Sequence, residues 1–553
     1  MVAKRCFIML LLFSLLFMAL TIRLFDLHVI ENKEMARAAS VQRLSNVKLQ
    51  QARGNILDRN GIPLTCRDEK YIVAIKPLLL KNDEYALWRI SYTLGIDYHD
   101  LKYKVENGIK PILFEVPEDI KNEIINIDSP GISVINMLSR YSENSVARHI
   151  LGYLNKVDGK GEVGIEKFYN KTLSTDTWYG IGVITDGINN ILPGMGYRLL
   201  KWEDNKKILN VKLTIDYHIQ KIVEDVMEEN NINGAIVIEE VKSGDIVAIA
   251  SKPDYDQNNV SKYLNSSGSE LFNKAVASYN LGSIFKIIDV ATLLKLNGST
   301  WNEKYICTGS IRVGDREYKC YSYEEGGHGL VDMKQAFALS CNTYFIHAMS
   351  QVDPDKLLEM ARRFGLGNYT GIIDQGIDES QGNLPASGVY LLGGDIANIS
   401  IGQGEIMATP LQIADIVATI ANGGIKNKIN IADCIEDEDG KKVREIREKS
   451  GSRILERRIV NKIQEMMESV IDEGTGIMID LAEFGGAAGK TASAETGQIK
   501  NGENVVHAWF AGYFPRKNPK YAIAVFIENG RIGGRVAGPI FQKIAEEIMK
   551  RGY

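Results

Sequence analysis

The chain opens on an uninterrupted apolar stretch. Residues 7–22 carry no charged side chain, and Lys4 and Arg5 stand just before them. This length suits a membrane-spanning helix, which needs roughly 17–25 residues, and basic residues on the N-terminal side place that end in the cytoplasm. A cleaved signal peptide is the alternative, but no small-x-small cleavage site follows. We therefore predict a cytoplasmic tail at residues 1–5, a retained single-pass anchor at residues 6–24, and a remainder outside the cytoplasmic membrane.

Regular apolar patterns begin again near residue 210. Residues 235–238 and 246–249 are apolar runs separated by the turn residues 242–245, which predicts a hairpin of buried strands. The same region carries further patterned segments: a helix that Asp216 opens as N-cap, strands at residues 508–514 and 521–527, and a helix at residues 539–549. Helices at both ends of an antiparallel sheet predict an α+β domain over residues 210–553.

The segment between the anchor and this domain has a weaker pattern. The whole chain is too long for one core, since a domain takes roughly 150 residues. Within residues 25–209 the clearest signal is Asn60-Gly61, a turn that joins two short strands. We predict a separate domain over residues 25–209.

Charge and cysteine content exclude two classes of protein. The net charge of -5 argues against a nucleic-acid partner, which would require a clustered basic excess. The six cysteines are scattered rather than regularly spaced, which argues against a disulfide scaffold. The chemistry therefore has to be sought in local motifs.

Three short motifs stand in one order along the chain: Ser283-Ile-Phe-Lys286, Ser340-Cys341-Asn342 and Lys490-Thr491-Ala492. Each pattern alone is weak, because S-x-x-K also occurs at residues 45–48 and S-x-N at residues 142–144. Taken singly, each also has an ordinary structural interpretation as a capping serine, a polar loop or a solvated lysine. Their order, spacing and context favour the catalytic interpretation.

The first motif places a nucleophile beside a base. The apolar spacing of residues 282–296 predicts a helix with Ser283 in its first turn and Lys286 on the same face. A serine hydroxyl needs a neighbouring base, and a desolvated lysine amine can be neutral enough to take its proton. The positive end of the helix also favours the developing alkoxide.

The second motif follows a helix predicted over residues 332–339, so Ser340 and Asn342 are expected in a loop that faces the same cleft. Ser340 is a candidate to pass a proton to a leaving amine. Asn342 is a candidate to hold Lys286 or the substrate.

The third motif predicts a binding strand. The chain alternates here as a strand would, with Thr491 and Ser493 on one face to bind a substrate carboxylate and Lys490 to supply positive charge. Backbone N–H groups of Ser283 and Ser493 are candidates for an oxyanion hole, in which one donor contributes ~3 kcal/mol. A phosphate-binding P-loop is excluded, because Phe484 stands where its first glycine is required.

This motif set is similar to that of penicillin-binding proteins and serine β-lactamases. Further segments resemble class B penicillin-binding proteins, the monofunctional peptidoglycan D,D-transpeptidases: residues 53–61, 150–153, 164–166, 401–404 and 409–412. The resemblance implies the penicillin-binding transpeptidase fold, a central antiparallel sheet with flanking helices, and an elongated pedestal or dimerisation domain over residues 25–209. One departure is Ala492, where the family usually has glycine, and we expect its methyl group to narrow the cleft or alter β-lactam affinity.

The resemblance also implies the reaction and its partners. The serine would attack the penultimate D-alanine carbonyl of a stem peptide, expel the terminal D-alanine and pass the acyl group to an amine of a neighbouring strand, and β-lactams would acylate it. The implied catalytic residues are Ser283, Lys286, Ser340, Asn342 and Lys490. The implied substrate-binding residues are Thr491, Ala492 and Ser493. No stretch resembles a glycosyltransferase domain, so glycan polymerisation would come from a membrane partner of the SEDS type.

Between the first two motifs lies a set of metal-ligating residue types: Cys307, Asp315, Cys320 and His328. Two thiolates, an imidazole and a carboxylate suit a tetrahedral, structural zinc site. The spacing is wider than in a zinc finger, and Asp332 or Glu317 could replace Asp315. A disulfide between Cys307 and Cys320 is a second interpretation, favoured by an oxidising exterior, and two unrelated buried thiols are a third.

Other functions share these sequence features. A D,D-carboxypeptidase would use the same motifs with water as acceptor, although the anchor and pedestal argue against it. A β-lactamase is disfavoured, because nothing matches the glutamate-bearing deacylation motif of class A enzymes. A scaffold of a wall-synthesis complex with a dispensable serine is the alternative outside catalysis. The sequence leaves open whether the chain serves elongation, division or sporulation.

Overall fold

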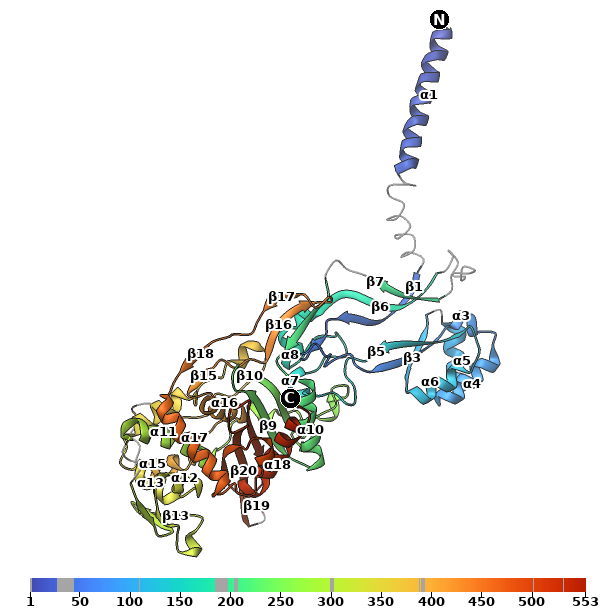
Figure 1. Cartoon of the computed structure of the whole chain (residues 1–553). Coiled ribbons are helices and arrows are strands. Elements are labelled where there is room, and N and C mark those ends of the chain that lie inside the picture. The colour runs from blue at the N-terminus through green and yellow to red at the C-terminus, as the bar shows by residue number, and fades with distance from the viewer. Residues whose placement is uncertain are drawn as a thin grey trace. The chain divides into compact units, whose positions relative to one another are not determined.

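The computed structural model describes residues 2–26, 44–108, 110–184, 197–202, 207–298, 303–386, 388, 393–500, 502–530 and 532–553. Helix α1 (Val2–Phe25) is the first element (Figure 1). Its segment Phe7–Phe25 has a mean hydropathy of 2.4 and is not buried against the protein. By length and composition this helix is able to cross a membrane, which agrees with the predicted anchor.

The chain divides into two compact units. Residues 1–52, 68–139 and 175–207 form the first unit, and residues 53–67, 140–174 and 208–553 form the second. Two N-terminal segments thus pack with the larger, C-terminal unit. The domain boundary placed at residue 209 stays a prediction.

The first unit contains two three-stranded sheets. One has the order β4-β3-β5, with β3 (Glu69–Ile75), β4 (Ile112–Val116) and β5 (Ile132–Leu138). The other has the order β1-β6-β7, with β1 (Leu44–Arg53), β6 (Ser174–Ile184) and β7 (Tyr197–Trp202). Four helices pack apolar residues such as Leu87 and Leu101 against Val73 and Ile75 of β3: α3 (Pro77–Leu80), α4 (Glu84–Leu94), α5 (Tyr98–Asn107) and α6 (Glu118–Ile125).

The second unit is built on a five-stranded antiparallel sheet with the order β10-β9-β21-β20-β19. Its strands are β9 (Gly234–Glu240), β10 (Asp245–Lys252), β19 (Ala488–Lys500), β20 (Glu503–Phe514) and β21 (Tyr521–Ile527). The predicted hairpin and the two predicted C-terminal strands are therefore confirmed.

Alternate residues of these strands enter two separate cores, because successive side chains of a strand point to opposite faces. Ile236 and Phe510 pack with α10 (Tyr217–Glu229) and α18 (Gly533–Lys550) on one face. Val237 and Trp509 pack on the other face with α11 (Lys286–Leu296) and α16 (Pro410–Ala421). Helices on both faces of an antiparallel sheet confirm the predicted α+β class.

Helix α18 begins six residues before the predicted start. The prediction took Pro539 as the first helical position, where proline is common, but the structure holds this proline inside the helix. The preceding turn is helical from Gly533 onward.

Further helices and strands complete the second unit. They are β2 (Ile56–Leu57), α7 (Arg148–Leu151), α8 (Gly164–Phe168), α9 (Asn170–Leu173), β8 (Leu209–Leu213), β11 (Tyr305–Cys307), β12 (Ser310–Val313), β13 (Arg316–Lys319), β14 (Gly329–Val331), α12 (Met333–Ala338), α13 (Asn342–Met349), α14 (Pro354–Arg363), α15 (Gly393–Ser400), β15 (Ile425–Asn427), β16 (Ala432–Asp437), β17 (Lys442–Glu445), β18 (Gly451–Arg453) and α17 (Arg457–Asp472). The predicted Asn60-Gly61 turn is present, with Gly61 at a φ of 87°.

Three distant segments of the second unit bring the motifs together. The first motif begins in a 3-10 turn (Gly282–Phe285) that continues directly into α11. The second motif follows α12 and ends at Asn342, the first residue of α13, and the third lies on the edge strand β19. Gly282 has a φ of 54°, and a Cβ atom there would lie 2.8 Å from the Ser493 carbonyl oxygen, so this close approach requires glycine.

A buried ion cluster joins the N-terminal segments of the second unit. The Glu166 carboxylate is fully buried and lies 2.7 Å from the Arg53 guanidinium and 2.6 Å from that of Arg140. The Tyr141 hydroxyl donates a third hydrogen bond to it at 3.1 Å. Removing one member of such a cluster leaves an uncompensated buried charge.

Glu166→Ala should therefore destabilise the protein by about 3–5 kcal/mol, because two buried guanidinium groups lose their carboxylate. Denaturant unfolding of the full-length protein in detergent measures the change. The exposed Glu143→Ala variant is the control and should unfold like the wild type. Equal stability of all three proteins would contradict a structural role for the cluster.

Candidate active site

The Lys286 amine is held between the first two motifs. It is completely buried and donates hydrogen bonds to the Ser283 Oγ at 3.0 Å, the Ser340 carbonyl at 2.8 Å and the Asn342 Oδ1 at 2.8 Å. The helical path from the 3-10 turn into α11 places Lys286 on the same side as Ser283. The predicted contact between Ser283 and Lys286 is thus present.

The surroundings of Lys286 favour its neutral form. Burial lowers the pKa of Lys286 to about 8, against the opposing charges of Cys341, Cys320 and Asp289. A lysine with such a pKa is partly neutral near physiological pH. It is therefore able to accept the proton of the Ser283 hydroxyl.

Ser340 connects two buried amines. Its Oγ accepts a hydrogen bond from Lys490 at 3.0 Å and lies 3.3 Å from the Lys286 amine. Burial, and then the nearby charge of Lys286, hold the pKa of Lys490 well below its usual range. Ser340 itself has a φ of 52°, a conformation that a non-glycine residue adopts only under constraint. These contacts link Lys286, Ser340 and Lys490 in one continuous chain, along which a proton can move from Lys286 through Ser340.

The third motif divides its residues between the cleft and the core. Ser493 lines the cleft, and its Oγ accepts a hydrogen bond from the Gly533 N–H at 3.1 Å. The Thr491 hydroxyl pairs with that of Thr475 at 2.6 Å and is almost buried. Of the two side chains predicted to bind a substrate carboxylate, Ser493 is therefore more exposed to the cleft than Thr491.

The structure does not support the expectation that the Ala492 methyl group narrows the cleft, and an effect on β-lactam affinity stays a prediction. Its side chain is only 3% exposed, belongs to the core beneath the sheet and lies next to Gly282, and it does not line the cleft. Side chains alternate along a strand, so the residue between Thr491 and Ser493 points to the opposite face. The methyl group cannot narrow the cleft directly.

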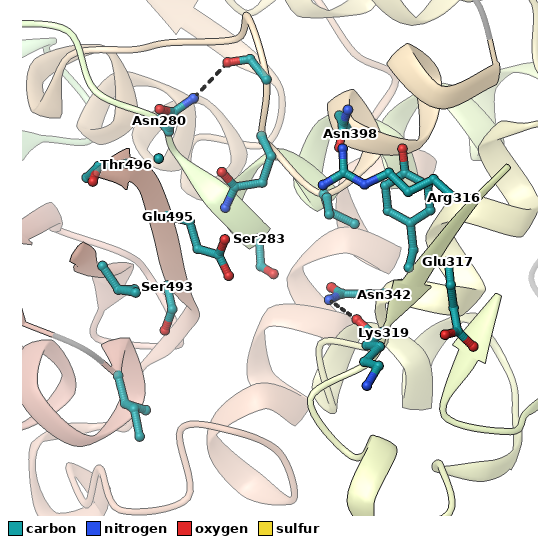
Figure 2. Close-up of a pocket in the computed structure, with 17 residues that line it drawn as sticks. Asn280, Ser283, Arg316, Glu317, Lys319, Asn342, Asn398, Ser493, Glu495 and Thr496 are labelled. Carbon is teal, nitrogen blue, oxygen red and sulfur yellow. Dashed lines mark hydrogen bonds between the residues drawn. The ribbon is translucent and has the colours of Figure 1, made fainter. Parts of the chain in front are cut away.

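A cleft of about 800 Å³ is lined by Ser283, Asn342 and Ser493 from the three motif segments (Figure 2). Several of its lining residues are absent from the sequence prediction: Asn280, Arg316, Lys319, Asn398, Gln403 and Glu495. Glu495 was detectable, because it continues the alternation of Thr491 and Ser493. The others come from loops, a hairpin and helix α15, whose positions depend on tertiary packing.

A cluster of sulfur and nitrogen ligands lies beside the second motif. Cys307, Cys320, His328 and Cys341 place their ligand atoms within 4.8 Å of one another. The His328 Nδ1 is 3.5 Å from the Sγ atoms of both Cys307 and Cys320. These cysteines are free, so the interpretation as a disulfide is not supported.

The fourth member of this cluster differs from the prediction. Asp315 is exposed in the turn between β12 and β13 and does not belong to the group. The substitutes also have other partners, since Asp332 caps α12 and Glu317 accepts a hydrogen bond from Ser310. The fourth member of the cluster is Cys341, the middle residue of the second motif.

Two separations within the cluster match tetrahedral coordination of zinc. Zn–S and Zn–N bonds of about 2.3 and 2.0–2.1 Å give an S···N separation of roughly 3.5 Å at the tetrahedral angle, which is the separation at both cysteines. A hydrogen bond with Cys341 and the neighbouring His328 hold the pKa of Cys320 well below its usual range. The same hydrogen bond and burial raise the pKa of Cys341, so Cys320 ionises before Cys341.

Two protein-family models match this chain, one in its N-terminal part and one in its C-terminal part. Residues 234–546, more than half of the sequence, match the penicillin-binding protein transpeptidase domain, and residues 48–216 match the penicillin-binding protein dimerisation domain.

Relatives align along almost the whole length. The peptidoglycan D,D-transpeptidase MrdA of Acinetobacter baumannii is 26% identical over 93% of this chain and 83% of its own. The stage V sporulation protein D of Bacillus subtilis is 26% identical over 99% of this chain and 86% of its own. A solved chain from a peptidoglycan synthase complex that coordinates polymerization and crosslinking has a TM-score of 0.71 and 26% identity, covering 98% of this chain and 97% of that one.

The matching domains occur in the order typical of one subgroup, with the dimerisation domain before the transpeptidase domain. The motifs, the buried lysines and the cleft all lie within the matched transpeptidase domain. The chain therefore belongs to the class B penicillin-binding proteins.

Proposed function

We propose that this chain is a peptidoglycan D,D-transpeptidase whose nucleophile is Ser283. The observation that carries this proposal is the 3.0 Å hydrogen bond between the Ser283 Oγ and a buried lysine whose pKa is lowered to about 8. The names of the full-length relatives support the substrate and the reaction type. The chain thus acts on stem peptides in cell-wall synthesis.

The acylation step uses the contacts of both lysines. Lys286 takes the Ser283 proton as Oγ attacks the penultimate D-alanine carbonyl, and the backbone N–H groups of Ser283 and Ser493 stabilise the oxyanion. Ser340 passes a proton to the leaving D-alanine nitrogen and receives one from Lys286, and the C–N bond breaks. An amine of a second strand then attacks the ester and gives up a proton, which returns to Ser283 through Lys286 as the C–Oγ bond breaks. Water in place of the amine would give the carboxypeptidase reaction.

The membrane anchor and a polymerising partner complete the proposal. Helix α1 would hold the chain in the cytoplasmic membrane, with the transpeptidase domain on the outer side, where peptidoglycan is cross-linked. A glycosyltransferase of the SEDS type would supply the glycan strands. Support comes from the similar chain in a solved complex that coordinates polymerization and crosslinking.

We also propose a structural zinc ion at Cys307, Cys320, His328 and Cys341. All four ligands are protein side chains, which is typical of structural rather than catalytic zinc. When bound, the ion would cross-link β11, the end of β13 and the start of α13. The chemistry at Ser283 does not require it as a reactant.

Ser283→Ala should abolish formation of a penicilloyl adduct, because the ester oxygen is removed. Lys286→Ala should lower the acylation rate by about 10²–10⁴-fold, the usual loss for a general base. Intact mass spectrometry of the full-length protein with penicillin measures both effects, and exposed Ser452→Ala serves as the control. An adduct on Ser283→Ala would refute the assignment of the nucleophile.

The acylation rate should rise with pH and level off above a pKa near 8. The lowered pKa belongs to Lys286, and only its neutral form, present above that pKa, accepts the serine proton. Stopped-flow measurement of penicillin acylation between pH 6 and pH 10 checks this, with the pH stability of the protein measured in parallel. A rate that falls over this range would contradict a neutral lysine base.

Purified protein should contain one zinc ion per chain by inductively coupled plasma mass spectrometry. Cys307→Ser and His328→Ala should each lose most of the metal and melt at a lower temperature, because structural zinc contributes to folding. Asp315→Ala is the matched control and should keep its zinc. Loss of metal in that control, or zinc-free wild-type protein, would overturn the proposed ligand set.

A further inference from the structure

Two opposite charges face each other across the catalytic cleft. Glu495 belongs to β19 on one wall, and Arg316 belongs to β13 on the other, and both line the same cavity as Ser283. Among the described residues, no cation lies within 4.0 Å of the Glu495 carboxylate and no carboxylate lies that close to the Arg316 guanidinium. Both charged groups are therefore available to a bound molecule.

The backbone of Glu495 is held by Gln403. In the amide orientation that satisfies both of its polar atoms, the Gln403 Oε1 accepts a hydrogen bond from the Glu495 N–H at 3.1 Å and its Nε2 donates one to the Glu495 C=O at 3.2 Å. This pairing fixes the backbone and leaves the carboxylate exposed in the cleft. Figure 2 shows the side chain extending toward Ser283.

The Arg316 side chain is also supported by its strand. Its guanidinium lies over the Tyr318 ring at 5.1 Å, and the Tyr318 hydroxyl donates a hydrogen bond to the Gly394 carbonyl at 3.0 Å. A stacked guanidinium keeps its N–H edge free to bind a carboxylate in two-pronged fashion. The same strand ends just before Cys320, so the proposed metal site would help to fix it.

A negative charge beside the nucleophile has a specific chemical use. The donor peptide ends in a carboxylate, which Glu495 would repel, whereas the acceptor brings an ammonium group, which Glu495 would attract. Arg316 across the cleft then matches a carboxylate. The two charges together suit an acceptor that carries both groups close together.

We propose that Glu495 and Arg316 form the acceptor subsite and select an amine whose own carbon also bears a carboxylate. Such an end group belongs to a diaminodicarboxylic acid residue, such as diaminopimelate. A lysine side chain ends in an ammonium alone and would leave Arg316 unmatched. This inference rests on the proposed transpeptidase function and names the acceptor that the sequence left open.

The transfer step then balances as follows. The ammonium held by Glu495 loses one proton to solvent, and the neutral amine attacks the carbonyl of the acyl-Ser283 ester. The new C–N bond forms, the C–Oγ bond breaks, and the second amine proton passes through Lys286 to Ser283. Glu495 positions the acceptor and excludes competing water by keeping an amine in place.

The test measures how one acyl-enzyme divides between transfer and hydrolysis. Full-length protein in detergent receives a D-Ala-D-Ala pentapeptide donor and either a diaminopimelyl or a lysyl tripeptide acceptor of otherwise equal sequence. The ratio of cross-linked to hydrolysed product does not depend on the acylation rate. For the wild type it should be at least tenfold higher with the diaminopimelyl acceptor.

Substitutions at Glu495 and Arg316 separate binding of the acceptor ammonium from binding of its carboxylate. Glu495→Gln should lower the ratio with both acceptors by about 10- to 100-fold, the loss expected for one charge-assisted contact. Arg316→Gln should remove the preference for the diaminopimelyl acceptor, and Arg316→Lys should restore part of it. Arg312→Gln is the matched control on the paired strand β12, since this exposed arginine does not line the cleft, and it should behave like the wild type.

The outcomes separate this inference from the proposed function. Equal use of both acceptors by the wild type, or an unchanged ratio in Glu495→Gln, would overturn the acceptor subsite while the transpeptidase function stands. Failure of the wild type to form any acyl-enzyme with the donor or with penicillin would overturn both.

Discussion

The burial of the Lys286 amine is the constraint on which the rest of the site depends. An ammonium group is costly to bury, so an amine without exposure must find acceptors, shift its pKa, or both. Lys286 does both, with acceptors from its own turn and from the second motif. Because those acceptors come from separate segments, the segments have to meet at one point. The two cores on either side of the sheet hold them there.

The second motif contains a residue with a strained backbone conformation. Ser340 keeps a positive φ while it contacts two lysine amines, so the surrounding structure has to hold it. The residue between Ser340 and Asn342 is Cys341, a member of the proposed zinc cluster. A metal bound there would fix the backbone at the middle of the motif. Structural metal and catalytic geometry would then be linked through one residue.

Strand β19 serves two environments because its side chains alternate. Lys490 and Ala492 point into the protein, where the amine reaches Ser340 and the methyl group packs beside Gly282. Ser493 and Glu495 point into the cleft. A single strand thus supplies the buried base system and the exposed recognition groups. A shift of its register by one residue would exchange the two sets.

The sequence by itself determined the elements with strong local patterns. Apolar periodicity identified the anchor helix, the hairpin of β9 and β10, and the helix that places Ser283 near Lys286, since such features depend on neighbouring residues. Local patterns also supplied the three motifs and most of the metal cluster. The α+β class followed from the order of these elements.

Only the tertiary structure decided which residues meet across long separations. Cys341 replaces Asp315 in the metal cluster because hairpin β12–β13 carries Asp315 outward while α13 begins at the cluster. Arg316 reaches the cleft from a segment without a local signal, and Glu495 faces it from a strand far along the chain. The periodicity of a segment predicts which face of a helix or strand a side chain occupies. It does not predict which other element packs against that face. That depends on the packing of whole elements, which no local pattern contains.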